Sequence, residues 1–225
     1  MKRIAEETLS RRGWLSRQPE PFRRRVFAEC QLQQFERGAP IYHLGDPPGG
    51  AYGIAAGALA VSIAPGDRGP YFAHLGTAGT WFGEGPFLTG QPRRVGLEAA
   101  TECVLMYLPL PAMERMAADD PMAIRRFAQI AIGNLDLALG VVADLMIGQP
   151  ERRIAAVLVR SAGLQDERTV RLSQAELGRL ANVSRKLVNR ALQRFAAASM
   201  VLPRYGAVQI LDMQALKQFS AGARQ

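Results

Sequence analysis

The stretch from Leu172 to Phe195, LSQAELGRLANVSRKLVNRALQRF, combines a cationic helix with a tight turn. Its second half carries four positive charges and an amide, on Arg185, Lys186, Asn189, Arg190 and Arg194. Arginine can bind guanine O6 and N7 through two hydrogen bonds, and asparagine can bind adenine in the same way. A site that bound phosphates alone would not need Asn189. The spacing therefore favours a helix that reads base edges in a DNA groove.

The neighbouring residues predict two short helices that hold these side chains behind the turn. Ser173 and Glu176 form an S-x-x-E capping box, which starts the first helix. Asn182 stands where the turn needs a residue that tolerates positive φ, and Ser184 can cap the second helix. The apolar side of the second helix is formed by Leu187, Val188, Ala191, Leu192 and Phe195. Its basic residues are left on the opposite face.

A β-hairpin is predicted directly after this motif. In MVLPRYGAVQILD, two short apolar runs flank the turn residues Tyr205-Gly206. A helix-turn-helix followed by a hairpin is the layout of a winged-helix DNA-binding domain. An ordinary helical hairpin with a solvated basic surface is the alternative that the pattern leaves open.

The charge of the chain is concentrated in the same region. Residues 1–150 hold 15 basic and 15 acidic residues, whereas residues 151–225 hold 13 basic and 5 acidic ones. The last third therefore carries the whole formal net charge of +8. Such an asymmetry indicates a polyanionic partner for the C-terminal part.

The N-terminal half has the pattern of an antiparallel β domain. Residues 36–110 are rich in Gly and Pro and consist of short apolar runs separated by turn signals such as Gly45-Asp46-Pro47-Pro48 and Pro65-Gly66-Asp67. This texture predicts a sandwich or barrel. A short helix is expected before it, from Phe22 to Phe35.

A long helix is predicted to begin at Asp119-Asp120-Pro121 and to run to about Ile147. Asp is a good N-cap and Pro suits the first helical position, while Gln149-Pro150 ends the helix. One heptad-like apolar stripe comprises Ile124, Ala128, Ala131, Leu135, Ala138, Val142 and Leu145, and a second comprises Phe127, Ile130, Leu137 and Val141. We expect the β domain to cover one stripe and a second copy of the helix to cover the other. Burial within one monomer remains the alternative. A further helix follows in ERRIAAVLVRSAG, with Gly163 as its C-cap.

Composition points to a cytoplasmic globular protein. The hydrophobic content of 48% is ample for a core. Two cysteines, Cys30 and Cys103, suggest a reducing compartment. The first residues contain no apolar segment of the kind that a secretory signal needs, and no apolar run approaches the roughly 20 residues of a membrane span. We therefore expect no membrane partner.

The sequence resembles the Crp/Fnr family of bacterial transcription regulators from about residue 20 to 215. That family's DNA-reading motif typically contains S-R-x-x-V-x-R, which Ser184, Arg185, Val188 and Arg190 match. IYHLGDPPGGAYGIAAGAL is similar to the family's first β-hairpins. The resemblance implies an α+β protein with an N-terminal jelly-roll (a double-stranded β-helix of the cyclic-nucleotide-binding type), a dimerisation helix and a C-terminal winged helix-turn-helix. The expected domains are 1–118, 119–148 and 149–225.

The resemblance also implies a transcription regulator that binds palindromic double-stranded DNA as a homodimer through the 184–195 helix. Its expected DNA-binding residues are Ser184, Arg185, Lys186, Asn189 and Arg190. Its expected dimer interface contains Ala131, Leu135, Ala138, Val142 and Leu145. RNA polymerase is an expected partner if the protein is an activator. Relatives that read a TGTGA-type half-site carry Glu at the position of Lys186, and the cyclic-AMP receptor has glycine at that of Asn189.

WFGEGPFLTGQPRR looks like the family's phosphate-binding cassette, but with departures. In relatives the Glu accepts from a ribose hydroxyl and the Arg pairs with a cyclic phosphate. Gly83, Glu84 and Arg93 match, whereas Pro86 removes an amide donor and Arg94-Val95 replaces a Ser/Thr-Ala pair. Ala138 and Leu139 lack the hydroxyls that cyclic-AMP binders use for the base. The candidate effector residues are Gly83, Glu84, Arg93 and Arg94, and we expect the effector not to be cyclic AMP.

Several alternatives stay open at the effector site. An anion held by Arg93 and Arg94, another nucleotide, an internal Glu84–Arg93 ion pair and the absence of any ligand all fit the sequence. A cyclic-nucleotide-responsive regulator, or a sensor that acts through protein partners, also remains possible.

Other chemistries find less support. An iron–sulfur cluster needs about four cysteines, and nothing in the spacing of His43 and His74 favours haem. A cupin-type metal enzyme usually needs several clustered histidines, and the sequence contains no catalytic motif that we recognise. We therefore expect no enzyme activity, no metal and no cofactor.

Overall fold

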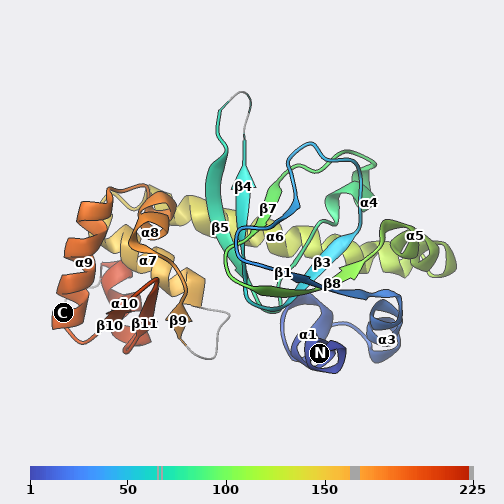
Figure 1. The fold of residues 1–225 in the computed structure, drawn as a ribbon, viewed down its shortest axis with the longest axis horizontal. Helices are drawn as coiled ribbons and strands as arrows, with labels where there is room; N and C mark the ends of the chain where they lie inside the picture. Colours follow the sequence, from blue (N-terminus) through green and yellow to red (C-terminus); the bar gives the residue numbers. More distant parts are fainter. Residues whose placement is uncertain (65, 67, 163–167, 223–225) are drawn as a thin grey trace. The chain divides into compact units, whose positions relative to one another are not determined.

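The computed structural model describes residues 1–64, 66, 68–162 and 168–222. It divides into two compact units, Met1–Asp136 and Leu137–Gln225, and the division falls inside the long helix α6 (Met122–Met146). Figure 1 shows the order of the elements along the chain. The expected C-cap Gly163 lies outside the described residues, as do Pro65 and Asp67 of one expected turn.

The described part of the first unit contains two four-stranded antiparallel sheets, which confirms the expected jelly-roll class. One sheet has the order β1 (Gln31–Phe35), β8 (Cys103–Leu108), β3 (Ala51–Ala56), β6 (Trp81–Phe82). The other has the order β2 (Pro40–Tyr42), β7 (Gly96–Ala99), β4 (Ala58–Ile63), β5 (Tyr71–Thr77). A core cluster that includes Ile54, Leu59, Phe82, Leu97 and Leu105 draws its side chains from both sheets.

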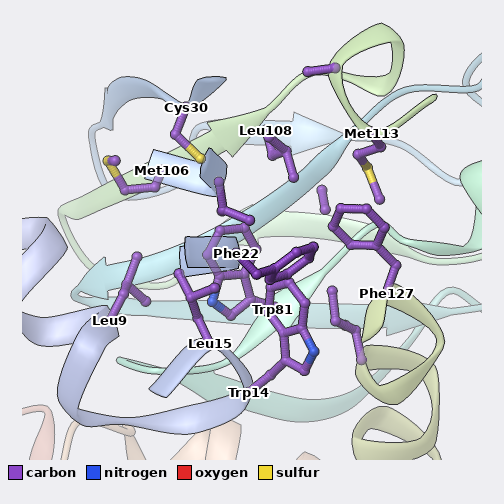
Figure 2. Close-up of a cluster of buried hydrophobic side chains, with 14 of the residues drawn as sticks. Leu9, Trp14, Leu15, Phe22, Cys30, Trp81, Met106, Leu108, Met113 and Phe127 are labelled. Carbon is purple, nitrogen blue, oxygen red and sulfur yellow. The ribbon is translucent and has the colours of Figure 1, made fainter. Parts of the chain in front are cut away.

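A second hydrophobic cluster joins the N-terminal helices to the sheet and to α6 (Figure 2). The N-terminal helices are α1 (Lys2–Arg11), α2 (Gly13–Ser16) and α3 (Glu20–Glu29), and α5 (Leu110–Asp119) contributes side chains to the same cluster. The Trp14 ring lies edge-on to Trp81 at 5.3 Å and 5.9 Å from Phe127 of α6. Its indole N–H also donates to the Arg126 carbonyl at 2.7 Å. The first part of α6 is thereby fixed to the β domain.

The helix expected from Phe22 to Phe35 is only partly correct. Helix α3 ends at Glu29, and Cys30 is already extended, with φ −76° and ψ 142°. Residues Gln31–Phe35 instead pair with β8 in an antiparallel ladder. These residues form a strand because they hydrogen-bond to β8, some 70 positions away in the chain. The local periodicity of the sequence carries no information about that partner.

The second unit is built around α7 (Pro150–Ala162). Its buried face includes Ile154, Val157 and Leu158. Helices α8 (Gln174–Ala181), α9 (Arg185–Ala197) and α10 (Met213–Ala221) surround it. Strands β9 (Thr169–Val170), β10 (Val201–Arg204) and β11 (Ala207–Ile210) form an antiparallel sheet in the order β10-β11-β9. A helix-turn-helix followed by a hairpin is thus present, as predicted.

Candidate functional site

The turn between α8 and α9 is built by the residues that the sequence singled out. Ser173 and Glu176 form the reciprocal capping box, with hydrogen bonds of 3.2 and 2.7 Å. Asn182 adopts the left-handed conformation, with φ 50° and ψ 54°. A Cβ on Gly178 would lie 2.8 Å from the Val183 carbonyl oxygen, so the glycine permits the two helices to approach. Gly178 is not among the residues predicted from the sequence, although a glycine inside a helix can indicate close packing.

Helix α9 presents a polar face to solvent and an apolar face to the core. The Ser184 hydroxyl accepts from the Leu187 amide at 3.3 Å and caps the helix. Val188, Ala191, Leu192 and Phe195 are buried. All five candidate DNA-binding residues are exposed: Ser184, Arg185, Lys186, Asn189 and Arg190. This arrangement exposes guanidinium, ammonium and amide groups of the kind that hydrogen-bond base edges and phosphates.

Two side chains on α9 have partners within the unit. Arg194 forms an ion pair with Glu151 of α7 at 2.5 Å, so its charge is partly neutralised. The Asn189 amide donates to Gln174 Oε1 of α8 at 3.4 Å. An amide held in this way retains its carbonyl oxygen and one N–H, the pair that adenine requires.

The hairpin of β10 and β11 forms a wing beside the reading helix. Its turn residues are Tyr205, which is fully exposed, and Gly206, with φ 67°. Arg204 is also exposed. An arginine and a tyrosine at the tip add hydrogen-bond donors to this polar surface.

The cassette residues lie between β6 and β7, around the short helix α4 (Gly85–Thr89). Arg93 is buried, with 5% of its surface exposed. Its guanidinium donates to the carbonyls of Gly83 at 2.9 Å and Gly50 at 2.8 Å, and it lies 4.1 Å from the centroid of the Tyr42 ring. Arg94, in contrast, is exposed. The structure therefore does not bring the two arginines together around one anion.

Glu84 is bound by a residue of the long helix. The Asn134 amide nitrogen lies 3.1 and 3.3 Å from the two carboxylate oxygens and 3.1 Å from the Trp81 carbonyl. Burial raises the pKa of the Glu84 carboxyl, and hydrogen bonds and the Arg93 charge oppose this only in part. An ion pair between Glu84 and Arg93 is not among the salt bridges of the described residues. Asn134 was missed from the sequence, although an amide inside an apolar helical run is a detectable signal.

The two apolar stripes of α6 have different surroundings. Phe127 and Ile130 are buried against the β domain, whereas Ile124, Leu135, Val142 and Leu145 are between 42% and 53% exposed. Ala138 is exposed and Ala131 is half-buried. By length and composition, α6 is also the one helix in the described part of the chain that could cross a membrane, which the sequence did not lead us to expect. Exposed apolar patches of this kind often mark interaction sites.

The cysteines and histidines are the remaining residues that could act as sensors. Cys30 and Cys103 are both buried, and burial raises the pKa of the Cys30 thiol to about 12. His43 is exposed, and His74 is buried beside Phe82. Among the described residues, no three His, Cys, Asp or Glu side chains are grouped so as to hold a metal ion.

Comparisons with known proteins agree with this architecture. Residues 32–120 match the cyclic nucleotide-binding domain family, and residues 152–219 match the Crp-like helix-turn-helix domain family. The transcriptional regulatory protein btr of Bordetella pertussis is 24% identical, over 81% of this chain and 78% of its own. A CRP-like cAMP-activated global transcriptional regulator of Mycobacterium tuberculosis is 26% identical, over 84% and 87% respectively. The structure of FixK2 from Bradyrhizobium japonicum superposes with a TM-score of 0.74 at 18% identity, covering 87% of this chain and 99% of that one.

Proposed function

Because the chain belongs to the Crp/Fnr family of DNA-binding transcription regulators, we propose that it binds a palindromic operator as a homodimer through α9. The observation that carries the proposal is the exposed polar face of α9, which follows a turn between two capped helices. Arg185 and Arg190 would contact guanines, Asn189 an adenine, and Lys186 a guanine, a thymine O4 or a phosphate. Ser184 stands at the N-terminus of the helix, where a hydroxyl can reach a phosphate.

The homodimer would form through the exposed stripe of α6. The candidate interface is Ala131, Leu135, Ala138, Val142 and Leu145. A membrane is the other environment that could cover such a face, but Asp136 is exposed near the middle of the helix. Burying that charge at a bilayer centre would cost about 2.5–3.5 kcal/mol. A second copy of α6 covers the apolar stripe and leaves Asp136 in water. We accordingly place the protein in the cytoplasm.

The cassette would not act as a cyclic-AMP receptor. The two buried charged side chains of the cassette have partners within the chain: Arg93 binds two backbone carbonyls, and Glu84 binds Asn134. A nucleotide would have to displace these bonds before it could use either group. We propose that operator binding requires no cyclic nucleotide. RNA polymerase would be the second partner if the bound protein activates transcription, and no catalytic step is needed in this scheme.

Binding of genomic fragments by the purified protein tests this function. The protein is first checked by mass spectrometry for bound nucleotide, and its mass in solution is measured by sedimentation. We expect a dimer that selects discrete fragments without added nucleotide. Its affinity should fall steeply, by about 10³-fold or more between 50 and 200 mM salt if it contacts at least six phosphates. A monomer, or an affinity that is nearly independent of salt, would contradict the proposal.

A further inference from the structure

Arg153 of α7 connects three backbone segments of the second unit. Its Nε donates to the carbonyl of Ala181 at 2.6 Å, and its two terminal nitrogens donate to the carbonyls of Ile147 at 3.0 Å and Asn182 at 3.3 Å. Ala181 is the last residue of α8, and Asn182 begins the turn that precedes the reading helix. Ile147 directly follows α6. One rigid guanidinium therefore fixes the helix-turn-helix turn to the end of the long helix.

Arg160 makes a second connection one heptad further along α7. Its Nε lies 2.7 Å from Asp144 Oδ2 of α6, and the two side chains are only 16% and 15% exposed. A Cβ on Gly140 would lie 3.3 Å from Cδ of Arg160, so the glycine leaves room for the arginine stem. Residues seven apart lie on the same face of a helix. Both arginines thus hold one face of α7 against the last turns of α6.

These contacts are not needed to form the core of the unit. Ile154, Val157 and Leu158 are fully buried and already anchor α7 among the other helices. Ion pairs with little exposure add little net stability, but they restrict how two elements can be arranged. Such contacts are suited to fixing the position of α7 relative to the end of α6.

We propose that Arg153 and Arg160 are positioning residues, which fix the reading helix relative to the end of α6 and so set the half-site spacing that the dimer accepts. The inference rests on the proposed function, because spacing has meaning only for a dimer on a palindrome. Two half-sites about one helical turn apart demand that each reading helix be held at a fixed place. In each chain, α7 is the first element that joins α6 to the helix-turn-helix.

The test measures affinity against spacing. Duplexes carry the selected operator, the same half-sites with one or two base pairs inserted between them, or a single half-site. Binding is followed by fluorescence anisotropy for wild type, Arg153→Lys, Arg153→Gln and Asp144→Asn. Arg152→Gln is the matched control, because Arg152 also donates to a backbone carbonyl, that of Ser220 at 3.1 Å, but contacts α10 instead. Thermal melts establish that each variant is folded.

We expect wild type and Arg152→Gln to discriminate sharply between spacings. In Arg153→Gln and Asp144→Asn the discrimination should fall about tenfold, as expected for the loss of one charge-assisted hydrogen bond, while affinity for the single half-site changes less than about threefold. Arg153→Lys keeps the charge but loses the planar guanidinium with its several fixed donors, and should behave like Arg153→Gln. Folded variants with the spacing preference of wild type would overturn the inference. Failure of wild type and control alike to bind any duplex would instead refute the proposed function.

Discussion

The side-chain amide of Asn134, on α6, lies within hydrogen-bonding distance of both oxygens of the Glu84 carboxylate, at 3.1 and 3.3 Å. Glu84 is the carboxylate that the family's cassette resemblance assigns to a ribose hydroxyl. Here an internal donor from the long helix takes that place. The cassette and α6 are thereby linked by hydrogen bonds within the chain.

Replacing Asn134 should weaken this link. In Asn134→Ala the buried carboxylate loses its amide donor, and we expect the first unit to lose about 1–3 kcal/mol of stability. Asn134→Asp should be worse, because it places a second carboxylate beside Glu84. Chemical denaturation measures both. Gln129→Ala is the control, since it removes another side-chain hydrogen bond on α6, the one that Gln129 accepts from Gln18 at 2.8 Å, without changing the cassette. Equal stability of Asn134→Ala and the control would argue against the link.

The raised pKa of Glu84 gives a pH-dependent prediction. A carboxyl whose pKa is higher in the folded than in the unfolded protein makes the fold more stable as the pH falls through that higher pKa. Well above that pKa this stabilisation is absent. Glu84→Gln removes the buried charge while keeping an oxygen that can accept from Asn134. The variant should therefore melt at a higher temperature than wild type at pH 7, and the gap should narrow on acidification towards pH 4–5. A gap that stays constant with pH would contradict the raised pKa.

Cyclic AMP should not change the melting temperature. A ligand that binds the native state stabilises it by about 2.7 kcal/mol at a hundredfold excess over its Kd. Since Arg93 and Glu84 are both held internally, we expect no shift at millimolar cyclic AMP. Differential scanning fluorimetry is sufficient for this test. A clear upward shift that Arg93→Ala abolishes would show that the cassette opens to admit the nucleotide.

The exposed stripe of α6 should be required for dimerisation. Leu135→Glu combined with Val142→Glu would place like charges face to face across a two-fold axis, and we expect monomers that no longer bind the operator. Ala143→Glu is a suitable control, because Ala143 is exposed and lies seven residues from Asp136, off the stripe. Sedimentation velocity measures the outcome. A double variant that remains a dimer would remove α6 from the interface.

The reading domain could be predicted from the sequence because local rules determine it. Ser173, Glu176, Asn182 and Ser184 each act within three or four residues of their own position, and each has the predicted conformation or bond. The apolar stripe of α6 could be predicted in the same way, because helical periodicity is visible in the sequence without tertiary information.

Features that depend on distant contacts could not be predicted. The sequence does not predict helices α1, α2 and α5, and it favours a helix up to Phe35 where the structure has the strand Gln31–Phe35. The internal partners of Arg93 and Glu84 come from residues 10 to 50 positions away. The three carbonyls that bind Arg153 lie at the ends of α6 and α8. Only the folded chain brings such groups together.

Selection from a random DNA library tests the central claim most directly, with wild type, Lys186→Glu and Arg190→Ala compared in parallel. Lys186 has donors only, so wild type should select a palindrome that differs from TGTGA at the base pair read by Glu in relatives. Lys186→Glu supplies an acceptor for cytosine N4 and should move the preference towards TGTGA. Arg190→Ala should cost about 1–3 kcal/mol and relax the preference at one base pair. If wild type selects TGTGA, or if neither substitution changes the selected motif, α9 does not read the operator as described.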